Sequence, residues 1–295
     1  MPKSPRPIYA SDARAWDHCV RQAWFLFHPP GPEQPETDPF ADLIKALGEE
    51  HEAEILKSLD GPVEAHSVAH TQSLMAHRTP VIYQPKFRDD SRNVIGTPDF
   101  LFLTEEGYRV ADAKLALSVE KNRAIQAQLG VYQLLVAKSE VQDSDVQTLP
   151  KPVVFLGDGE ALEVDLETER LGAQFLVDMQ ELRNRDVQPK AAFAYSKCNA
   201  CVFFDYCMEG FEARDDLTLS PAIDVRAAQQ LEMQQFETLS QVAIAEPDDM
   251  HEAPYLRNPD KRLRIIQQAR SLKSGKPILR EAPEWPTGTM IHFDV

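Results

Sequence analysis

The sequence predicts a mixed α/β domain with a helical extension, and two patterns indicate this. Residues 80–87, 94–103 and 108–113 are short segments rich in β-branched and aromatic side chains, which is typical of strands joined by turns. Residues 40–59 and 124–138 flank these segments and carry apolar side chains at helical spacing. Helices before and after a group of strands are the pattern of an α/β domain.

Further elements complete this domain. A helix is expected over residues 11–27, and a loop over residues 29–39, where prolines interrupt helical hydrogen bonding. After the central helix, residues 152–156 favour a strand and residues 165–185 favour another helix.

The character of the sequence changes after Gly210, where Gln-rich and charged helical segments such as residues 224–236 begin. We therefore expect two domains, one over residues 1–210 and one over residues 211–295. The second is predicted to be a helical extension of the first.

Composition and charge exclude several classes of protein. The chain is 43% hydrophobic and 26% charged, which is typical of a globular rather than a disordered protein. No apolar run is long enough to cross a membrane, and the N-terminal residues lack the apolar core of a secretion signal, so we expect a cytoplasmic protein with no membrane partner. The net charge of −16 opposes unselective binding to nucleic acid, because neutralising phosphates requires surplus Lys and Arg.

One segment has the opposite charge. Residues 255–280 contain eight basic side chains and one acidic side chain. Such a segment is either a solvated helix face or a footprint for a phosphate backbone, and the first is the more common case.

Two acidic residues stand at corresponding ends of two expected strands. Asp99 ends one strand-like run, and Asp112 comes near the end of the next, beyond a turn at Glu106 and Gly107. A hairpin with this spacing places the two carboxylates side by side, in an all-oxygen pocket that suits Mg²⁺ or Mn²⁺. Lys114 points to the same face as Asp112, where it can stabilise charge on a phosphate or help to activate the attacking water.

Three more side chains extend this pattern. His51, on the helix before the strands, has the chemistry to complete a metal site, although a lone helical histidine is more often structural. Gln128 and Tyr132 are four residues apart on the helix that follows Lys114, so they share one face, either towards the site or at the edge of the core.

In this order the residues resemble the RecB-like branch of the PD-(D/E)XK nucleases, and Pro98 with Asp99, then Asp112 with Lys114, match the motif that names the group. The resemblance covers residues 8–210 and implies a restriction-endonuclease-like core, with a mixed sheet flanked by helices. It implies these roles: His51, Asp99, Asp112 and the carbonyl of Ala113 as metal ligands, Lys114 as a catalytic residue, and Gln128 and Tyr132 as its supporting motif.

The four cysteines are Cys19, Cys198, Cys201 and Cys207. Two thiolates separated by two residues, as at Cys198 and Cys201, can hold one metal centre, and the other two would complete a four-thiolate site. Disulfides are disfavoured in the cytoplasm, so metal ligation is the favoured interpretation, but spacing alone does not decide between zinc and an iron–sulfur cluster. The arrangement of one cysteine before the motifs and three after them resembles that of the iron–sulfur nucleases of CRISPR adaptation and of the AddB subunit. This resemblance implies a structural 4Fe–4S cluster.

Residues 211–295 resemble the segment that links such nucleases to a ribonuclease-H-like domain. The likeness rests on a helical pair over residues 223–245 and on the final run 290–295, which would be the first strand of that domain. We expect either that the sequence is truncated relative to that pattern or that the protein never had the domain. The turn of this pair usually carries glycine, but Gln235 and Phe236 stand there instead, which argues against DNA binding by the helical pair.

The resemblance implies a metal-dependent deoxyribonuclease, expected to act as an exonuclease on single-stranded DNA ends in repair, recombination or defence, with a helicase or nuclease partner. Two alternatives remain open. One is a non-catalytic nucleic-acid-binding or assembly subunit that keeps the cluster, and the other is a zinc-bound interaction module. The presence of Asp99, Asp112 and Lys114 together favours the enzyme.

Overall fold

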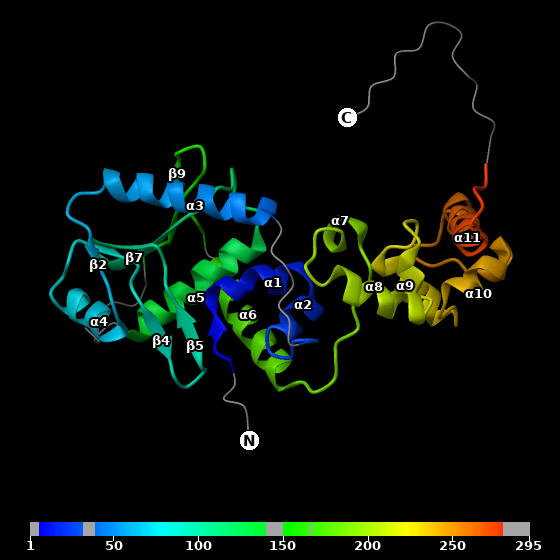
Figure 1. The fold of residues 1–295 in the computed structure, drawn as a ribbon, viewed down its shortest axis with the longest axis horizontal. Coiled ribbons are helices and arrows are strands. Elements are labelled where there is room, and N and C mark those ends of the chain that lie inside the picture. Colours follow the sequence, from blue (N-terminus) through cyan, green and yellow to red (C-terminus); the bar gives the residue numbers. More distant parts are fainter. Residues whose placement is uncertain (1–5, 32–38, 140–149, 166, 280–295) are drawn as a thin grey trace, which may run out of the picture. The chain divides into compact units, whose positions relative to one another are not determined.

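The chain divides into two compact units, which we call unit 1 (Met1–Ala191) and unit 2 (Ala192–Val295) (Figure 1). The computed structural model describes residues 6–31, 39–139, 150–165 and 167–279. The expected final strand at 290–295 and most of the expected loop at 29–39 lie outside these residues. The division falls after Ala191, whereas the sequence changes character near residue 210, so the domain boundary at 210 stays a prediction.

Unit 1 is built on two sheets. Its strands are β1 (Ile8–Tyr9), β2 (Val63–Glu64), β3 (Val81–Tyr83), β4 (Phe87–Asp89), β5 (Val94–Gly96), β6 (Phe100–Thr104), β7 (Gly107–Ala113), β8 (Val153–Phe155) and β9 (Ala161–Glu163). In the described part of the chain, one sheet has the order β1-β5-β4 and the larger one the order β2-β3-β6-β7-β8-β9. The larger sheet is mixed, because β3, β6 and β7 pair antiparallel while β7 pairs parallel with β8. The expected mixed sheet is confirmed.

Two of the expected strands are each divided in two. The run at 80–87 forms β3 and β4, and the run at 94–103 forms β5 and β6, and in both cases the two halves belong to different sheets. The breaks include Pro85 and Pro98, and proline has no N–H to donate to a neighbouring strand. A simple meander was therefore the wrong expectation, and β2 and β9 were not expected at all.

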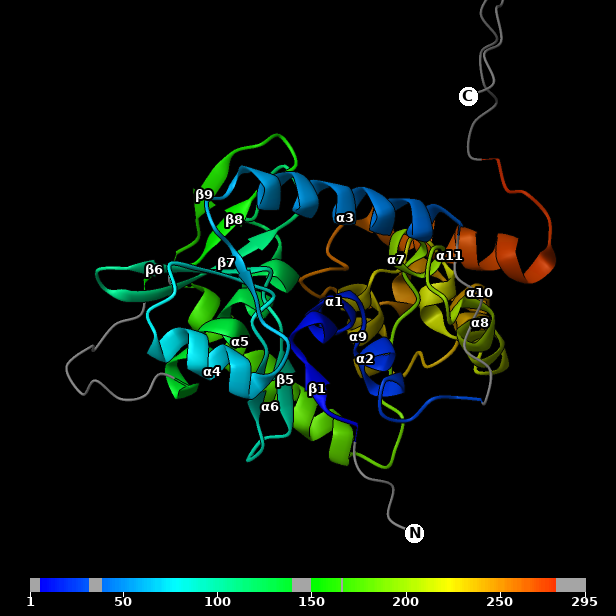
Figure 2. The ribbon, with the colours of Figure 1, turned by 60° about the vertical axis from the view of Figure 1, so that its left-hand side comes forward.

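Helices cover both sides of the larger sheet. They are α1 (Ala13–His18), α2 (Val20–Phe25), α3 (Pro39–Ser58), α4 (Val68–Ala76), α5 (Arg123–Ser139) and α6 (Glu167–Asn184). Figures 1 and 2 show α3 on one side of the strands and α5 with α6 on the other. The expected helices at 40–59, 124–138 and 165–185 are confirmed as α3, α5 and α6, whereas α4 was not expected. None of the described helices is long and apolar enough to cross a membrane.

The single helix expected over residues 11–27 is wrong, because the chain leaves the helical conformation at Cys19. This residue is extended (φ −162°, ψ 130°) and separates α1 from α2. Each short helix then makes a hydrogen bond through its own tryptophan. In α1, Trp16 Nε1 donates to Asp178 Oδ2 on α6 (2.8 Å). In α2, Trp24 Nε1 donates to the carbonyl of Arg185, just after the end of α6 (2.8 Å).

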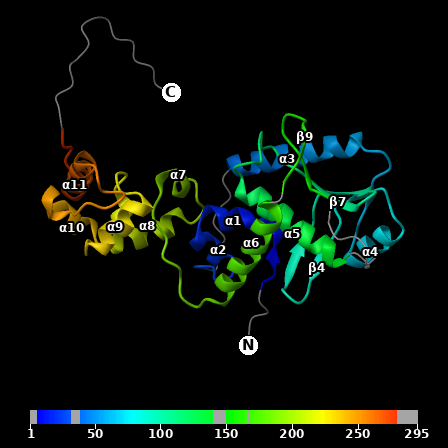
Figure 3. The ribbon, with the colours of Figure 1, turned by 180° about the vertical axis from the view of Figure 1, so that it is seen from behind.

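A backbone contact between two glycines sets the distance between α5 and α6, which lie side by side in Figure 3. A Cβ atom added to Gly130 would lie 1.8 Å from the carbonyl oxygen of Thr168, and one added to Gly172 would lie 2.6 Å from the carbonyl carbon of Gly130. No side chain can be accommodated at either position without separating the helices.

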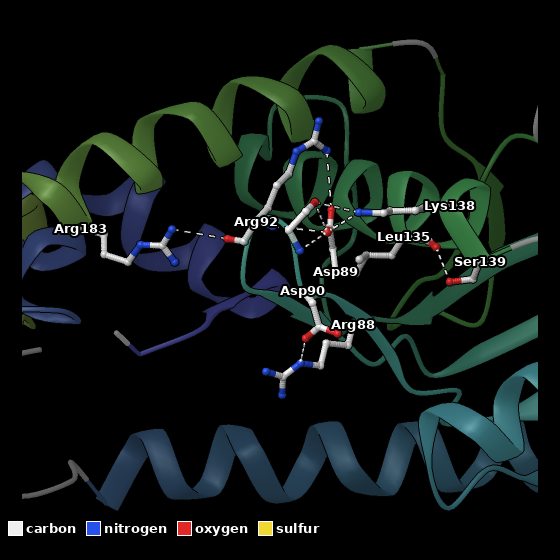
Figure 4. A network of polar contacts seen from close by, with 9 residues as sticks. Arg88, Asp89, Asp90, Arg92, Leu135, Lys138, Ser139 and Arg183 are labelled. Atoms are coloured by element: carbon white, nitrogen blue, oxygen red, sulfur yellow. Dashed lines mark hydrogen bonds and ion pairs between the residues drawn. The ribbon is translucent and has the colours of Figure 1, made fainter. Parts of the chain in front are cut away.

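A polar network ties the β4–β5 turn to these two helices (Figure 4). Asp89 is 3% exposed, and one of its oxygens accepts hydrogen bonds from Ser91 and from Lys138 on α5. Burial alone would raise the pKa of Asp89, but these bonds outweigh it and lower the pKa to about 2. Arg183 on α6 donates to the carbonyl of Arg92 in the same turn (3.4 Å).

Unit 2 is helical in its described part. Its elements are α7 (Tyr195–Cys198), α8 (Phe204–Ala213), η2 (Leu217–Leu219), α9 (Val225–Met233), α10 (Leu239–Ile244), η3 (Pro247–Asp249) and α11 (Pro259–Ser274). The expected helical pair is present as α9 and α10. At its turn Gln235 has a φ of 68°, which is the left-handed backbone that glycine adopts without strain.

The glycine contact gives a test of the packing. Gly130→Ala should lower the free energy of unfolding by about 3 kcal/mol or more, because the added methyl group overlaps the backbone of α6. Chemical denaturation measures the change. Gly48→Ala is the matched control: Gly48 is also helical, with nothing within 4 Å of an added Cβ, so alanine should leave stability equal or higher. Equal effects of the two substitutions would contradict the contact.

Candidate active site

The hairpin of β6 and β7 brings the two acidic residues together as the sequence predicts. Phe100 pairs with Ala111, so the same register continued by one residue sets Asp99 opposite Asp112. The backbone N–H of Asp99 donates to Asp112 Oδ1 (3.2 Å), and the backbone N–H of Ala113 donates to Asp99 Oδ2 (2.7 Å). Each strand therefore holds the carboxylate of the other.

The acidic pair is mostly shielded from water and electrostatically strained. Asp112 is 1% exposed, and Asp99 is partly exposed. Burial, and after it the charge of Asp112, raises the pKa of Asp99 above the ordinary value of an aspartate. Two adjacent carboxyl groups that are shielded from water are stabilised in their ionised form by a positive charge placed next to them.

Lys114 supplies part of that charge. Its ammonium group forms an ion pair with Asp112, and its backbone N–H donates to the carbonyl of Phe155 at the end of β8 (2.9 Å). Burial alone would lower the pKa of Lys114, but the charges of Asp112 and Asp99 outweigh it and raise the pKa. Lys114 is therefore a cation in this arrangement, suited to stabilising negative charge rather than to accepting a proton.

Gln128 and Tyr132 form the pair that their spacing predicts, on α5. Gln128 Nε2 donates to the hydroxyl of Tyr132 (2.7 Å). Burial, followed by the charge of Asp112, raises the pKa of Tyr132 well above its ordinary value, so the hydroxyl keeps its proton. Gly96 leaves room for this ring, because a Cβ there would lie 3.0 Å from Tyr132 Cδ1.

His51 lies at the edge of the site but is not grouped with the acidic pair. Its Nε2 atom stands 3.2 Å from the carbonyl oxygen of Phe155, the same oxygen that accepts from Lys114. A carbonyl oxygen accepts, so Nε2 acts as a donor here. Within the described ranges, no three His, Cys, Asp or Glu side chains are arranged so that they could hold a metal ion. The role of His51 as a ligand stays a prediction.

Sequence reasoning missed Glu52, the residue after His51 on α3. Its carboxylate accepts hydrogen bonds from the side-chain amide of Gln84 (3.0 Å) and from the hydroxyl of Tyr83, at the end of β3. The sequence carries no signal that separates Glu52 from Glu49 and Glu50, which also lie next to or near His51 on the same helix.

The donor set of the site fits a divalent cation. The carboxylates of Asp99 and Asp112 are hard oxygen donors, they are side by side, and their mutual repulsion would be relieved by a bound Mg²⁺ or Mn²⁺. The carbonyl of Ala113, next to Asp112 at the end of β7, is the further oxygen that the sequence predicts for this set.

The cysteines lie in two parts of the chain. Cys19 is at the break between α1 and α2, and the others are in α7, in α8 and in the turn between them. The N–H of Cys201 donates to the carbonyl of Cys198 (2.9 Å), and the N–H of Ala194 donates to Cys198 Sγ (3.4 Å). All four cysteines are described, all are partly exposed, and none forms a disulfide. Among the described residues these cysteines are not grouped so that three of them could hold a metal ion, and the four-thiolate site stays a prediction.

Four of the eight basic side chains of the segment at 255–280 are engaged inside unit 2. Lys261 pairs with Asp224 (3.5 Å), Lys273 with Asp215 (2.8 Å), and Arg270 with Glu246 (2.8 Å), and Arg262 donates to the carbonyl of Leu256 (2.7 Å). These contacts hold the helical unit together. They favour a structural role for the segment over a continuous footprint for phosphates.

Comparison with known families gives one result. The family model described as the PD-(D/E)XK nuclease superfamily matches residues 7–208. The matched span includes the acidic pair, Lys114 and all four cysteines. No curated protein matches the chain.

The strained acidic pair leads to a prediction for stability. Asp99→Asn should raise the free energy of unfolding of the metal-free protein by about 1–2 kcal/mol, because it replaces a carboxyl group whose ionised form is disfavoured beside Asp112, while the asparagine oxygen can still accept from Ala113. Urea unfolding in the presence of a chelator measures this change. Asp90→Asn, at an exposed position, is the control.

In the wild type Mn²⁺ should raise the melting temperature, and in Asp99→Asn that increase should be lost; an unchanged increase would contradict the assignment of Asp99 as a metal ligand.

Proposed function

Since the chain belongs to the PD-(D/E)XK nuclease superfamily, we propose that it is a metal-dependent deoxyribonuclease of the RecB-like type, acting on single-stranded DNA ends in repair, recombination or defence. The observation that supports this best is the Asp99–Asp112 pair with the ammonium group of Lys114 beside it. Superfamily membership supports phosphodiester hydrolysis and a nucleic-acid substrate. The choice of DNA, the action on ends and a helicase or nuclease partner are part of the proposal.

In this mechanism Asp99, Asp112 and the carbonyl of Ala113 would hold Mg²⁺ or Mn²⁺, with His51 as a further ligand. The bound ion would lower the pKa of a water molecule and neutralise charge on the phosphate. Lys114, which stays protonated, stabilises the negative charge that develops on the phosphate oxygens.

Gln128 and Tyr132 support the same site from α5. The Tyr132 hydroxyl keeps its proton and accepts from Gln128, and its ring is buried in the core. We propose that this pair supports the acidic site from within the core, by holding α5 and its side chains in place beside Asp112.

We further propose that Cys19, Cys198, Cys201 and Cys207 ligate a structural 4Fe–4S cluster. Support comes from the two-residue spacing between Cys198 and Cys201, which suits ligation of one metal centre, and from the partial exposure of all four thiols. A cluster that joins residues almost 180 positions apart in the sequence would stabilise the fold by restricting the unfolded chain.

Cleavage assays test the enzyme. Anaerobically purified protein should cleave end-labelled DNA only with Mg²⁺ or Mn²⁺, and Lys114→Ala should lower the rate about 10³-fold, because it removes the cation next to the phosphate. Lys121→Ala is the matched control, since Lys121 is exposed and a few residues away on the following loop. If Lys114→Ala and the wild type cleave at equal rates, the site is wrongly assigned. If protein with an intact cluster cleaves nothing, the non-catalytic subunit is the better description.

Metal analysis tests the cluster. The purified wild type should be brown and contain iron and acid-labile sulfide, whereas Cys201→Ser should lose both and unfold at a lower temperature, because metal-binding energy contributes to folding. Asp112→Asn should keep its iron, since it alters the acidic site alone. Zinc in place of iron in the wild type would refute the cluster and favour the zinc module.

A further inference from the structure

Two consecutive residues of α3 contact strands on opposite sides of the acidic pair. The larger sheet has the local order β3-β6-β7-β8, with Asp99 immediately before β6 and Asp112 on β7. His51 contacts the end of β8 through the Phe155 carbonyl, and Glu52 contacts the end of β3 through Tyr83 and Gln84. The helix is thus fixed over the site by contacts on both sides of it.

The Glu52 carboxylate is tightly held. The amide of Gln84 donates to Glu52 Oε1 (3.0 Å) and also approaches the Tyr83 hydroxyl (3.2 Å), which itself donates to Glu52. Burial and the bond to Glu52 raise the pKa of Tyr83 to about 12, so Tyr83 remains a donor at every working pH. A carboxylate with two fixed donors keeps its orientation.

The same residues connect Glu52 to the acidic pair through the backbone. Gln84 has a φ of 45°, a left-handed conformation that is costly for glutamine, and in this conformation its N–H donates to the carbonyl of Asp99 (2.8 Å). Gln84 therefore holds Glu52 with its side chain and Asp99 with its backbone.

We propose that Glu52 is a positioning residue of the metal site, whose clamped carboxylate accepts hydrogen bonds from the water molecules of a divalent cation held by Asp99 and Asp112. This inference rests on the proposed function. Glu52 acts through water rather than as a direct ligand, because its carboxylate is already held by the Gln84 amide and the Tyr83 hydroxyl. A fixed outer carboxylate strengthens cation binding through its charge and orients the bound water.

Mn²⁺ binding followed by electron paramagnetic resonance tests this role without relying on cleavage. Glu52→Gln should bind Mn²⁺ about tenfold more weakly than the wild type, as loss of an outer-shell partner does in other metal sites. The substitution keeps the shape of the side chain and an oxygen that can accept from Gln84 and Tyr83, so urea unfolding of the metal-free protein should be unchanged. Glu50→Gln makes the same charge change at an exposed position of α3 and should alter binding by no more than about twofold, because water and salt screen an exposed charge.

Asp112→Asn distinguishes a failure of the proposed role of Glu52 from a failure of the proposed metal site. If it abolishes Mn²⁺ binding while Glu52→Gln binds no more weakly than Glu50→Gln, the role of Glu52 is refuted and the metal site stands. If Asp112→Asn binds Mn²⁺ as well as the wild type does, the proposed metal site itself is refuted. The inference is supported if Asp112→Asn loses Mn²⁺ binding and if Glu52→Gln, but not Glu50→Gln, binds Mn²⁺ more weakly than the wild type does.

Discussion

The register of β6 against β7 is the constraint on which the rest of the site depends. It sets Asp99 beside Asp112, and the two strands then exchange hydrogen bonds through those same residues. A slip of one residue would turn one carboxylate to the opposite face of the sheet, and the pair would no longer exist. The neighbouring contacts, from Lys114 to β8 and from α3 to β3 and β8, all converge on the place that this register defines.

The sequence predicts this hairpin well because its signals are local. The spacing of Asp99 and Asp112 across a short turn, and the four-residue spacing of Gln128 and Tyr132, depend only on the geometry of strands and helices. Glu52 was missed for the opposite reason. Three glutamates stand around His51, and only the docking of α3 on the sheet distinguishes the one that faces the site.

Tertiary packing also decided the elements that the sequence predicted wrongly. The break at Cys19 divides an otherwise regular helical pattern, and each half then makes its own hydrogen bond through a tryptophan. The contact of Gly130 with Gly172 likewise joins helices that are far apart in sequence, so that neither glycine is informative by itself. In the same way, Pro85 and Pro98 show where strands stop but not that the pieces join different sheets.

Several basic side chains of unit 2 are engaged in contacts within that unit, and this affects how fast a nucleic-acid substrate can approach the protein. With a net charge of −16, and with Lys261, Arg262, Arg270 and Lys273 engaged in contacts within their own unit, the protein lacks a strong long-range attraction for a polyanion. The negatively charged protein and a nucleic-acid strand repel each other, and added salt shortens the range of this repulsion. Encounter with a nucleic-acid strand should therefore become faster as ionic strength rises, which is the reverse of the behaviour of proteins that capture nucleic acid on a basic surface.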